Sequence, residues 1–384
     1  MEHDKTHNPV LNIVGWVAFA AVVLATLLGG FFPAAKITIQ LGSIGVAVLM
    51  AIFSGIIRKV QPTAWSLGFK RWIILALVTT GIYASGVFPP VQPHIQVAPE
   101  VISREPLFTL PVIGDFYLTN TIVAMLIGDV ILILIALSVR NALKKGTLTP
   151  TGLPGFIEFL FGFLYDMTES TAGKWTKKIF PFFLSITLIV LVANWLEMFP
   201  GVDSIGLLEP SDHGYPLINI LPGLAGIVKG EAAQGEGYLV VPYVRVLSTD
   251  LNFTAALALI SIIFTQVIGV QAQGFSYFSK FFNTTTFFKK PLFGAIDWAV
   301  SVLELISEFS KIISFTFRLF GNVFAGMVLL FLIGTLIPVF AQSAILLFEF
   351  FIGLIQAFVF GMLTMVFMSM ATMGHGGEEN EHSA

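Results

Sequence analysis

The sequence IDWAVSVLELISEFSKIISFTFRLFGNVFAGMVLLFLIGT, residues 296–335, decides which kind of fold this chain adopts. A second long apolar run, residues 341–373, follows it after a short joint at Pro338. As helices with a rise of 1.5 Å per residue, the two runs would be about 60 Å and about 50 Å long. Because a bilayer has a hydrocarbon core of about 30 Å, neither helix can stand upright in it. No proline interrupts the first run before Pro338, so we expect a strongly tilted helical hairpin rather than broken helices.

Shorter apolar stretches of about 18 residues or more precede this pair, and each is long enough to cross a bilayer. Three of them form an N-terminal group, and three more follow with longer connections between them. The fold class that we predict is therefore an all-α integral membrane protein with about eight membrane helices, including the tilted C-terminal helical hairpin. The shorter stretches are residues 10–32, 39–57, 72–88, 118–139, 180–199 and 254–273.

Two connections and one amphipathic segment complete the expected architecture. The proline-rich residues 89–113 exclude a regular helix and predict an extended external linker. Residues 200–252, which are rich in Gly and Pro, predict a long external loop without a domain of its own. Residues 154–173 have apolar side chains at helical spacing opposite acidic ones, which predicts an amphipathic helix at the cytoplasmic interface. The predicted divisions are an N-terminal extension with three extra spans (1–89), an external linker (90–117), a main membrane domain (118–373) and a polar tail (374–384).

The composition excludes several classes of protein. Apolar residues make up 56% of the 384 and charged residues only 11%, against about 25% charged in a soluble domain. The net charge of −3 gives no reason to expect a nucleic-acid partner, and the lack of cysteine excludes disulfides and thiolate metal sites. Most Lys and Arg residues of the connections fall on one side if both termini are cytoplasmic, as the positive-inside rule requires. A cleaved signal peptide remains an alternative for residues 10–32, although such peptides have an apolar run of roughly 7–15 residues.

Charged side chains within the long apolar run form a stripe. Glu304, Lys311 and Arg318 recur every seven residues, so they share one helix face, and Asn322 lies a further turn along it. The stripe is about 27 Å long at 1.5 Å per residue. An ionisable group at mid-membrane costs about 2.5–3.5 kcal/mol on insertion scales, so these residues need a partner or a function.

The stripe has two explanations at this point. The charges could neutralise one another within the chain, with Glu308 pairing to Lys311 and Arg318 pairing to Glu349 across the hairpin. Alternatively, Arg318 acts on a titratable carboxylate or a passing ion, because an arginine near the middle of the membrane stays protonated where a lysine can lose its proton.

Four short motifs carry a resemblance to a known family. The segment SFTFRLFGNVFAG, residues 314–326, resembles the arginine motif of subunit a of the F-type ATP synthase. The segments QAFVF (356–360), NWLEMFPG (194–201) and DLNFT (250–254) resemble other signatures of this family, and they occur in the same order. The resemblance covers about 118–373 and implies the tilted hairpin, packed against a ring of c subunits, that the length of the apolar runs also requires.

The resemblance assigns expected roles to individual positions. It implies that Arg318 is the essential arginine facing the c-ring carboxylate, and that Asn322 and Gln356 are polar positions near it. The remaining matched positions belong to two half-channels that open to opposite faces of the membrane. On the external side they are Glu349, Glu197 and Asn194, and on the cytoplasmic side Ser314 and Glu304 with Lys311 between them.

The family also implies partners and a location. A member is a non-catalytic stator subunit of a complex in the bacterial cytoplasmic (inner) membrane, where it contacts the c-ring and the peripheral-stalk b subunits and meets the other subunits indirectly. No cofactor, metal or nucleic acid is implied. Whether the coupling ion is H⁺ or Na⁺ stays open, because the coordinating site is mainly on the partner ring.

Two departures and two rival classes complete the expectations. Met327 stands where many members carry Glu or His, and the three N-terminal spans have no counterpart in the five-span pattern of the family. A secondary transporter is the leading rival, although we find no internal repeat and no broken helices. An intramembrane hydrolase fits less well, because the sequence has neither a His-Glu-x-x-His nor a Gly-x-Ser-x-Gly motif.

Overall fold

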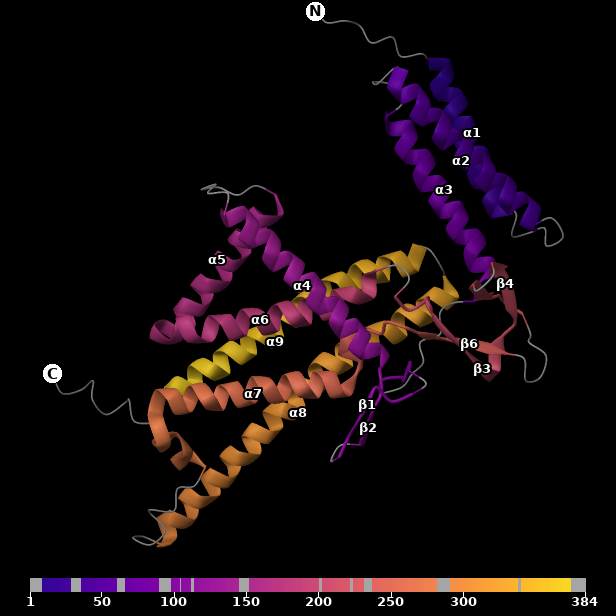
Figure 1. Cartoon of the computed structure of the whole chain (residues 1–384). Coiled ribbons are helices and arrows are strands. Elements are labelled where there is room, and N and C mark those ends of the chain that lie inside the picture. The colour runs from indigo at the N-terminus through magenta and orange to yellow at the C-terminus, as the bar shows by residue number, and fades with distance from the viewer. Residues whose placement is uncertain are drawn as a thin grey trace, which may run out of the picture. The chain divides into compact units, whose positions relative to one another are not determined.

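The computed structural model is largely helical, with short strands in the connections (Figure 1). Two compact units divide the chain, and each is described by itself. The polar tail 374–384 and the joint at Pro338 lie outside the described residues. The structure describes residues 9–28, 36–60, 66–89, 98–103, 105–111, 114–144, 152–199, 202–221, 224–230, 237–281, 291–337 and 340–373.

The first unit, within residues 1–90, 209–239 and 331–344, contains an N-terminal group of helices that lie side by side (Figure 1). These helices are α1 (Pro9–Leu28), α2 (Lys36–Val60) and α3 (Ser66–Val87), and they overlap the three predicted N-terminal stretches, of which residues 29–32 lie outside the described chain. Their buried core comprises Val22, Ala47, Ala51, Trp72 and Leu75.

The same unit contains an antiparallel hairpin of β4 (Leu217–Leu221) and β5 (Leu224–Ile227). The ammonium of Lys229, just after this hairpin, donates to the carbonyl of Ser85 on α3 at 2.6 Å. The hairpin is thus tied to the end of the helical group by a direct hydrogen bond. A further pair of strands, β3 (Gly206–Tyr215) and β6 (Tyr238–Pro242), runs from this unit into the second.

The second unit is built from long helices (Figure 1), and one of its buried apolar clusters lies between α6, α7, α8 and α9. Phe315, Leu319 and Val323 of α8 are buried there together with Phe360 of α9, and the rings of Phe315 and Phe360 are 5.0 Å apart. Its helices are α4 (Asn120–Lys144), α5 (Leu153–Ala172), α6 (Thr176–Trp195), α7 (Leu251–Gln273), α8 (Pro291–Leu336) and α9 (Phe340–Thr372). The last residues of α8 and the first residues of α9, within 331–344, belong to the first unit. Shorter elements are the 3₁₀ helices η2 (Gly173–Trp175), η3 (Leu196–Met198), η4 (Leu247–Thr249) and η5 (Gly274–Lys280). The antiparallel strands β1 (Phe108–Leu110) and β2 (Gly114–Phe116) also belong to this unit.

Local sequence explains where these helices begin and end. The side chain of Asp250 caps α7 by accepting from the backbone N–H of Asn252 at 2.9 Å, and α7 stops at Gly274, whose φ of 67° few other residues adopt. Pro154 near the start of α5 has no N–H to leave unsatisfied there. The predicted amphipathic segment 154–173 is thus a helix, and its place at a membrane interface stays a prediction.

Five helices of the described chain are long and apolar enough to cross a membrane, judged by length and composition. They correspond to the five predicted stretches from 118–139 onward, and the described parts of α1 and α2 contain shorter apolar segments. The total of eight membrane helices therefore stays a prediction. The absence of a break in residues 296–335 is confirmed, because α8 is one helix of 46 residues.

The described chain is mostly helical, as the predicted all-α membrane class requires, but its connections also contain short strands. Short strands pair within residues 206–242, where we expected only a loop, and β1 and β2 lie at the end of the expected linker. These strands have few side chains in the core and depend mostly on backbone pairing, so they leave no alternating apolar pattern in the sequence.

Candidate functional site

The helix α8 presents two different faces around Arg318. Phe315, Leu319 and Val323 are at most 2% exposed and pack into the core. On the opposite side, Ile313 and Phe317 are 55% and 57% exposed. Arg318 is half-buried and lies at the edge between these faces, so its charge is available to whatever covers the exposed face.

The contacts of Arg318 leave its charge uncompensated. Its Nη2 donates to Oγ of Ser314 at 3.4 Å, one turn earlier, and its guanidinium carbon lies 6.0 Å from the centre of the Phe315 ring. No carboxylate of the described residues lies within 4.0 Å of it. The internal pair with Glu349 that was one explanation of the stripe is therefore not formed, and that half of the neutralisation hypothesis is wrong.

An open cavity of about 240 Å³ lies beside the earlier part of the stripe. Hydroxyl groups and two cations supply its polar lining, and Ser314 connects it to the guanidinium of Arg318. Glu304, one of the predicted positions, is half-buried and is not in the lining. The lining residues are Ser307, Ser310, Lys311, Ser314, Phe315, Arg318, Leu363 and Phe367.

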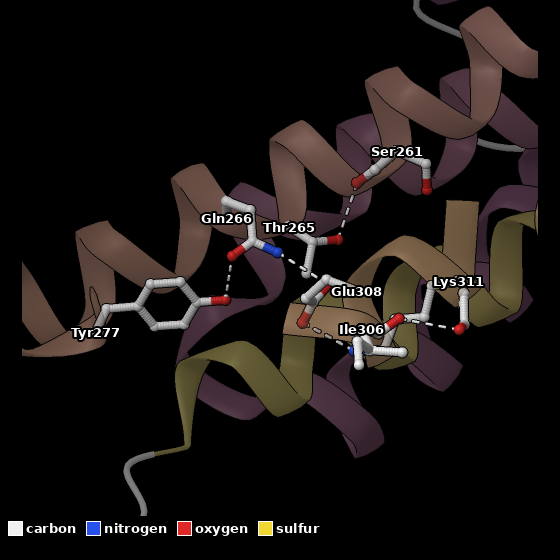
Figure 2. Close-up of polar contacts among 8 residues, drawn as sticks. Ser261, Thr265, Gln266, Tyr277, Ile306, Glu308 and Lys311 are labelled. Atoms are coloured by element: carbon white, nitrogen blue, oxygen red, sulfur yellow. Dashed lines mark hydrogen bonds and ion pairs between the residues drawn. The ribbon is translucent and has the colours of Figure 1, made fainter. Parts of the chain in front are cut away.

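The other half of the neutralisation hypothesis is confirmed. Nζ of Lys311 lies 2.9 Å from Oε1 of Glu308, three residues earlier on α8 (Figure 2). The second oxygen of Glu308 accepts from Nε2 of Gln266 on α7 at 3.0 Å, and Oε1 of Gln266 accepts from the hydroxyl of Tyr277 at 2.7 Å. We did not identify Gln266 or Tyr277 from the sequence, because they lie outside α8, at 42 and 31 residues before Glu308.

Asn322 and Gln356 meet across α8 and α9. Nδ2 of Asn322 donates to Oε1 of Gln356 at 2.7 Å, so two positions 34 residues apart in sequence form one contact. Gln356 is only 5% exposed, and its Nε2 is buried without a partner in the described part of the chain. A buried donor of this kind needs a water molecule or a partner group.

Glu349 lies against a glycine of the neighbouring helix. Its carboxyl group occupies the space where a Cβ on Gly326 would stand, which is possible only because that residue has no side chain. Glu349 is 8% exposed, and its Oε1 has no partner among the residues that the structure describes. Gly326 is eight residues after Arg318, or about 12 Å along α8.

Asn194 at the end of α6 connects three elements. Its Nδ2 donates to the carbonyl of Gly353 on α9 at 3.1 Å, and its Oδ1 accepts from the hydroxyl of Ser248 at 2.6 Å. The neighbouring Trp195 stacks on Phe350, with ring centres 4.6 Å apart. These contacts fix the end of α6 against the part of α9 that carries Glu349.

Glu197 follows in the turn after α6, and it lies within electrostatic range of Glu349 and Asp203. It is 8% exposed, and its Oε1 is buried without a partner in the described residues. Burial raises the pKa of Asp203, in the following connection, to about 6, although the nearby Arg245 opposes this shift. Three carboxyl groups therefore gather near the end of α6. Asp203 carries no signal in the sequence, because it lies in a connection outside the recognised motifs.

The family model for the ATP synthase A chain matches residues 121–369, which contain every position of the stripe and both groups of carboxyl and amide side chains.

Curated relatives give the same result. The chain is 25% identical over 264 residues to "ATP synthase subunit a, sodium ion specific" of Propionigenium modestum, which covers 66% of this chain and 78% of the relative. It is 33% identical over 193 residues to ATP synthase subunit a of Pseudoalteromonas translucida, and 27% identical over 197 residues to that of Geobacter sulfurreducens. These two matches cover 49% and 50% of this chain and about three-fifths of each relative, 60% and 62% respectively. The chain is therefore a multi-pass membrane protein that belongs to the ATP synthase A chain family, the family of subunit a of the F-type ATP synthase.

Proposed function

We propose that this chain is the stator subunit of the rotary membrane sector, and that it carries protons to and from the carboxylates of a rotating c-ring through two offset half-channels. The observation that supports the proposal most strongly is the uncompensated cation of Arg318 at the border of an exposed helix face. A side chain that only stabilised the fold would be expected to have a carboxylate partner, because an unpaired charge in the membrane is costly.

The charge on Arg318 would act on a rotor carboxylate that comes next to it. Two unit charges about 4 Å apart interact by about 4 kcal/mol at an effective dielectric constant near 20, which corresponds to about three pKa units. Such an interaction favours the ionised rotor acid and releases its proton. The same cation prevents a proton from passing directly between the half-channels.

The outer half-channel is proposed to run past the carboxyl groups near the end of α6. Glu197 and Glu349 each have a buried oxygen without a partner in the described chain, and Gln356 has a buried amide nitrogen in the same situation. Groups of this kind are satisfied by water, so they favour a hydrated path. Asn194 fixes α6 to α9 beside this path by donating to the carbonyl of Gly353. The hydrogen bond between Asn322 and Gln356 connects the path to the helical turn that follows Arg318.

The inner half-channel is proposed to use the cavity of about 240 Å³ beside Ser314. Its hydroxyl groups can carry water and hydrogen bonds away from Arg318. Glu304 would lie farther along α8 toward the cytoplasmic side, with Lys311 between it and Ser314. The membrane potential supplies about 2.3 kcal/mol per charge per 100 mV to protons that use this route.

The assembly around this subunit follows from the same proposal. The exposed face of α8 would contact the c-ring, and the b subunits of the peripheral stalk would hold the chain in place. Membership of the family implies a subunit of the membrane sector, with catalysis elsewhere in the complex. We place the chain in the bacterial cytoplasmic membrane with both termini on the cytoplasmic side, and we propose no cofactor and no nucleic-acid partner.

Substitution of Arg318 by alanine tests the proposal. We expect Arg318→Ala to abolish ATP-driven proton pumping in inverted membrane vesicles while the subunit still inserts and co-purifies with the c-ring. The matched control is Arg140→Ala, which removes an exposed arginine of α4 and should leave pumping within about twofold of the wild type. Coupled pumping at the wild-type rate in the Arg318 variant would overturn the assignment. Adding Na⁺ in the same assay distinguishes the two coupling ions, because the proposal requires no dependence on Na⁺.

A further inference from the structure

We infer that Glu308 is a positioning residue that holds Lys311 in a neutral pair at the wall of the inner cavity, so that Lys311 does not repel a departing proton. The inference rests on the proposed function and assigns a role to a carboxylate outside the positions discussed as proton carriers.

The cavity has an unbalanced set of charges. Lys311 and Arg318 both line it, and none of its lining residues is acidic. The two cations are seven residues apart on α8, which is about 10.5 Å along the helix. A proton that leaves the neighbourhood of Arg318 through this cavity must therefore pass a second positive charge.

Glu308 compensates that second charge from outside the lining. Its Oε1 accepts from Nζ of Lys311 at 2.9 Å (Figure 2), and the residue as a whole is only 7% exposed. The ammonium also lies 4.9 Å from the centre of the Phe367 ring on α9, which favours a cation at that place. Lys311 is thus held between Glu308 and the ring of Phe367.

Residues of other elements fix the orientation of Glu308. Its Oε2 accepts from Nε2 of Gln266 at 3.0 Å, and Gln266 is held in turn by the hydroxyl of Tyr277 at 2.7 Å (Figure 2). Gln266 belongs to α7 and Tyr277 to the 3₁₀ helix η5, so the position of the carboxylate is set from outside α8. Because both oxygens accept from fixed donors, the geometry suits a holding role better than repeated uptake and release of a proton.

Coulomb's law gives the size of the effect. At about 10 Å and an effective dielectric constant near 20, one unit charge changes an equilibrium or a rate by about tenfold. Glu308→Gln removes the compensating charge and leaves Lys311 in place. We therefore expect passive proton flux through the assembled membrane sector to fall about tenfold in this variant.

Three variants separate positioning from a structural role. Passive flux is measured in liposomes that contain the assembled membrane sector without its soluble head, with a K⁺ diffusion potential and a pH-sensitive dye. Glu308→Asp keeps the charge and should stay within about threefold of the wild type. Adding Lys311→Gln to Glu308→Gln should raise flux about fivefold over the single variant, because the repelling cation is then removed. Glu158→Gln, which removes an exposed carboxylate of α5, is the control for lost charge and should change flux less than twofold.

Each outcome supports or overturns the inference. Flux within twofold of the wild type in an assembled Glu308→Gln variant overturns it, and so does a double variant as slow as the single one. If the single variant does not assemble, the double variant decides: flux within threefold of the wild type supports the inference, and a loss of tenfold or more overturns it. Arg318→Ala, measured by ATP-driven pumping in parallel, keeps the two proposals apart. Pumping in that variant refutes the proposed function, whereas loss of pumping there together with normal flux in Glu308→Gln refutes only the role of Glu308.

Discussion

Substitution of Gly326 by alanine is expected to obstruct the outer half-channel. A Cβ at this position would lie 2.6 Å from Cδ of Glu349, and it would approach the carboxyl oxygens at least as closely. Carbon atoms in contact are normally about 3.5–4.0 Å apart, so the carboxyl group must move by about 1 Å. If Glu349 passes protons in its present position, a displacement of this size should reduce proton flux about 10- to 100-fold.

The same substitution should leave enough stability for assembly. Overpacking of a core costs about 1–3 kcal/mol, and the exchange of glycine for alanine in a helix returns up to about 1 kcal/mol. The net loss is therefore expected to be at most about 3 kcal/mol. Recovery of the membrane sector after detergent extraction measures whether the variant assembles.

Passive proton flux in liposomes, normalised to the amount of assembled sector, provides the assay. Gly128→Ala on α4 is the matched control, because its Cβ would lie at an ordinary distance of 3.6 Å from Cγ1 of Val192. Shortening the acid in the double variant Gly326→Ala/Glu349→Asp should recover about tenfold of the lost flux. Flux within twofold of the wild type in an assembled Gly326→Ala variant would refute the reasoning, since the outer path would then not depend on the position of Glu349.

Further predictions concern the outer carboxyl groups and their supports. Glu349→Gln should slow proton uptake from the outer side about tenfold or more with normal assembly, and an unchanged rate would place the outer path elsewhere. Asn194→Leu should destabilise the subunit by about 1–3 kcal/mol, because the carbonyl of Gly353 and the hydroxyl of Ser248 lose their partner, and an unchanged unfolding midpoint in detergent would contradict this. The pKa of Asp203 is raised from 3.8 to about 6, so the folded state binds more protons in that interval and stability should fall as the pH rises through it. Thermal unfolding between pH 4 and pH 7 should show a smaller loss in Asp203→Asn than in the wild type, and an equal loss would contradict this.

The sequence predicted the helices well because apolar runs of membrane length have few other solutions. The limits of the predicted runs agree with α4 and with α7 to α9 within a few residues, and α8 is continuous as expected. The strands β3 to β6 were not predicted, because no length or apolar pattern of their residues requires them. Backbone hydrogen bonds in an external connection depend on which segments meet, and residue types alone do not determine that.

The candidate positions were predictable where one helix carried them. Glu304, Lys311 and Arg318 share a face because a seven-residue repeat is nearly two turns, and the pair of Lys311 with Glu308 follows from a spacing of three. Contacts between helices were harder to foresee. The spacing of residues within α8 gives no information on Gln266. The alternative pair of Arg318 with Glu349 does not form, because Glu349 lies against Gly326, about two turns farther along.

The central claim is that the exposed face of α8 beside Arg318 meets a rotor carboxylate, and a cross-link tests it most directly. The chain contains no cysteine, so Phe317→Cys introduces a single thiol on that face, where the native side chain is 57% exposed. A second cysteine is placed next to the carboxylate of the c subunit, and a disulfide requires the two Cα atoms to come within about 7 Å. We predict that oxidation joins the two subunits and stops ATP-driven pumping, and that reduction restores it. If the thiol at position 317 never joins the c subunit while the assembled sector pumps normally, the claim is contradicted.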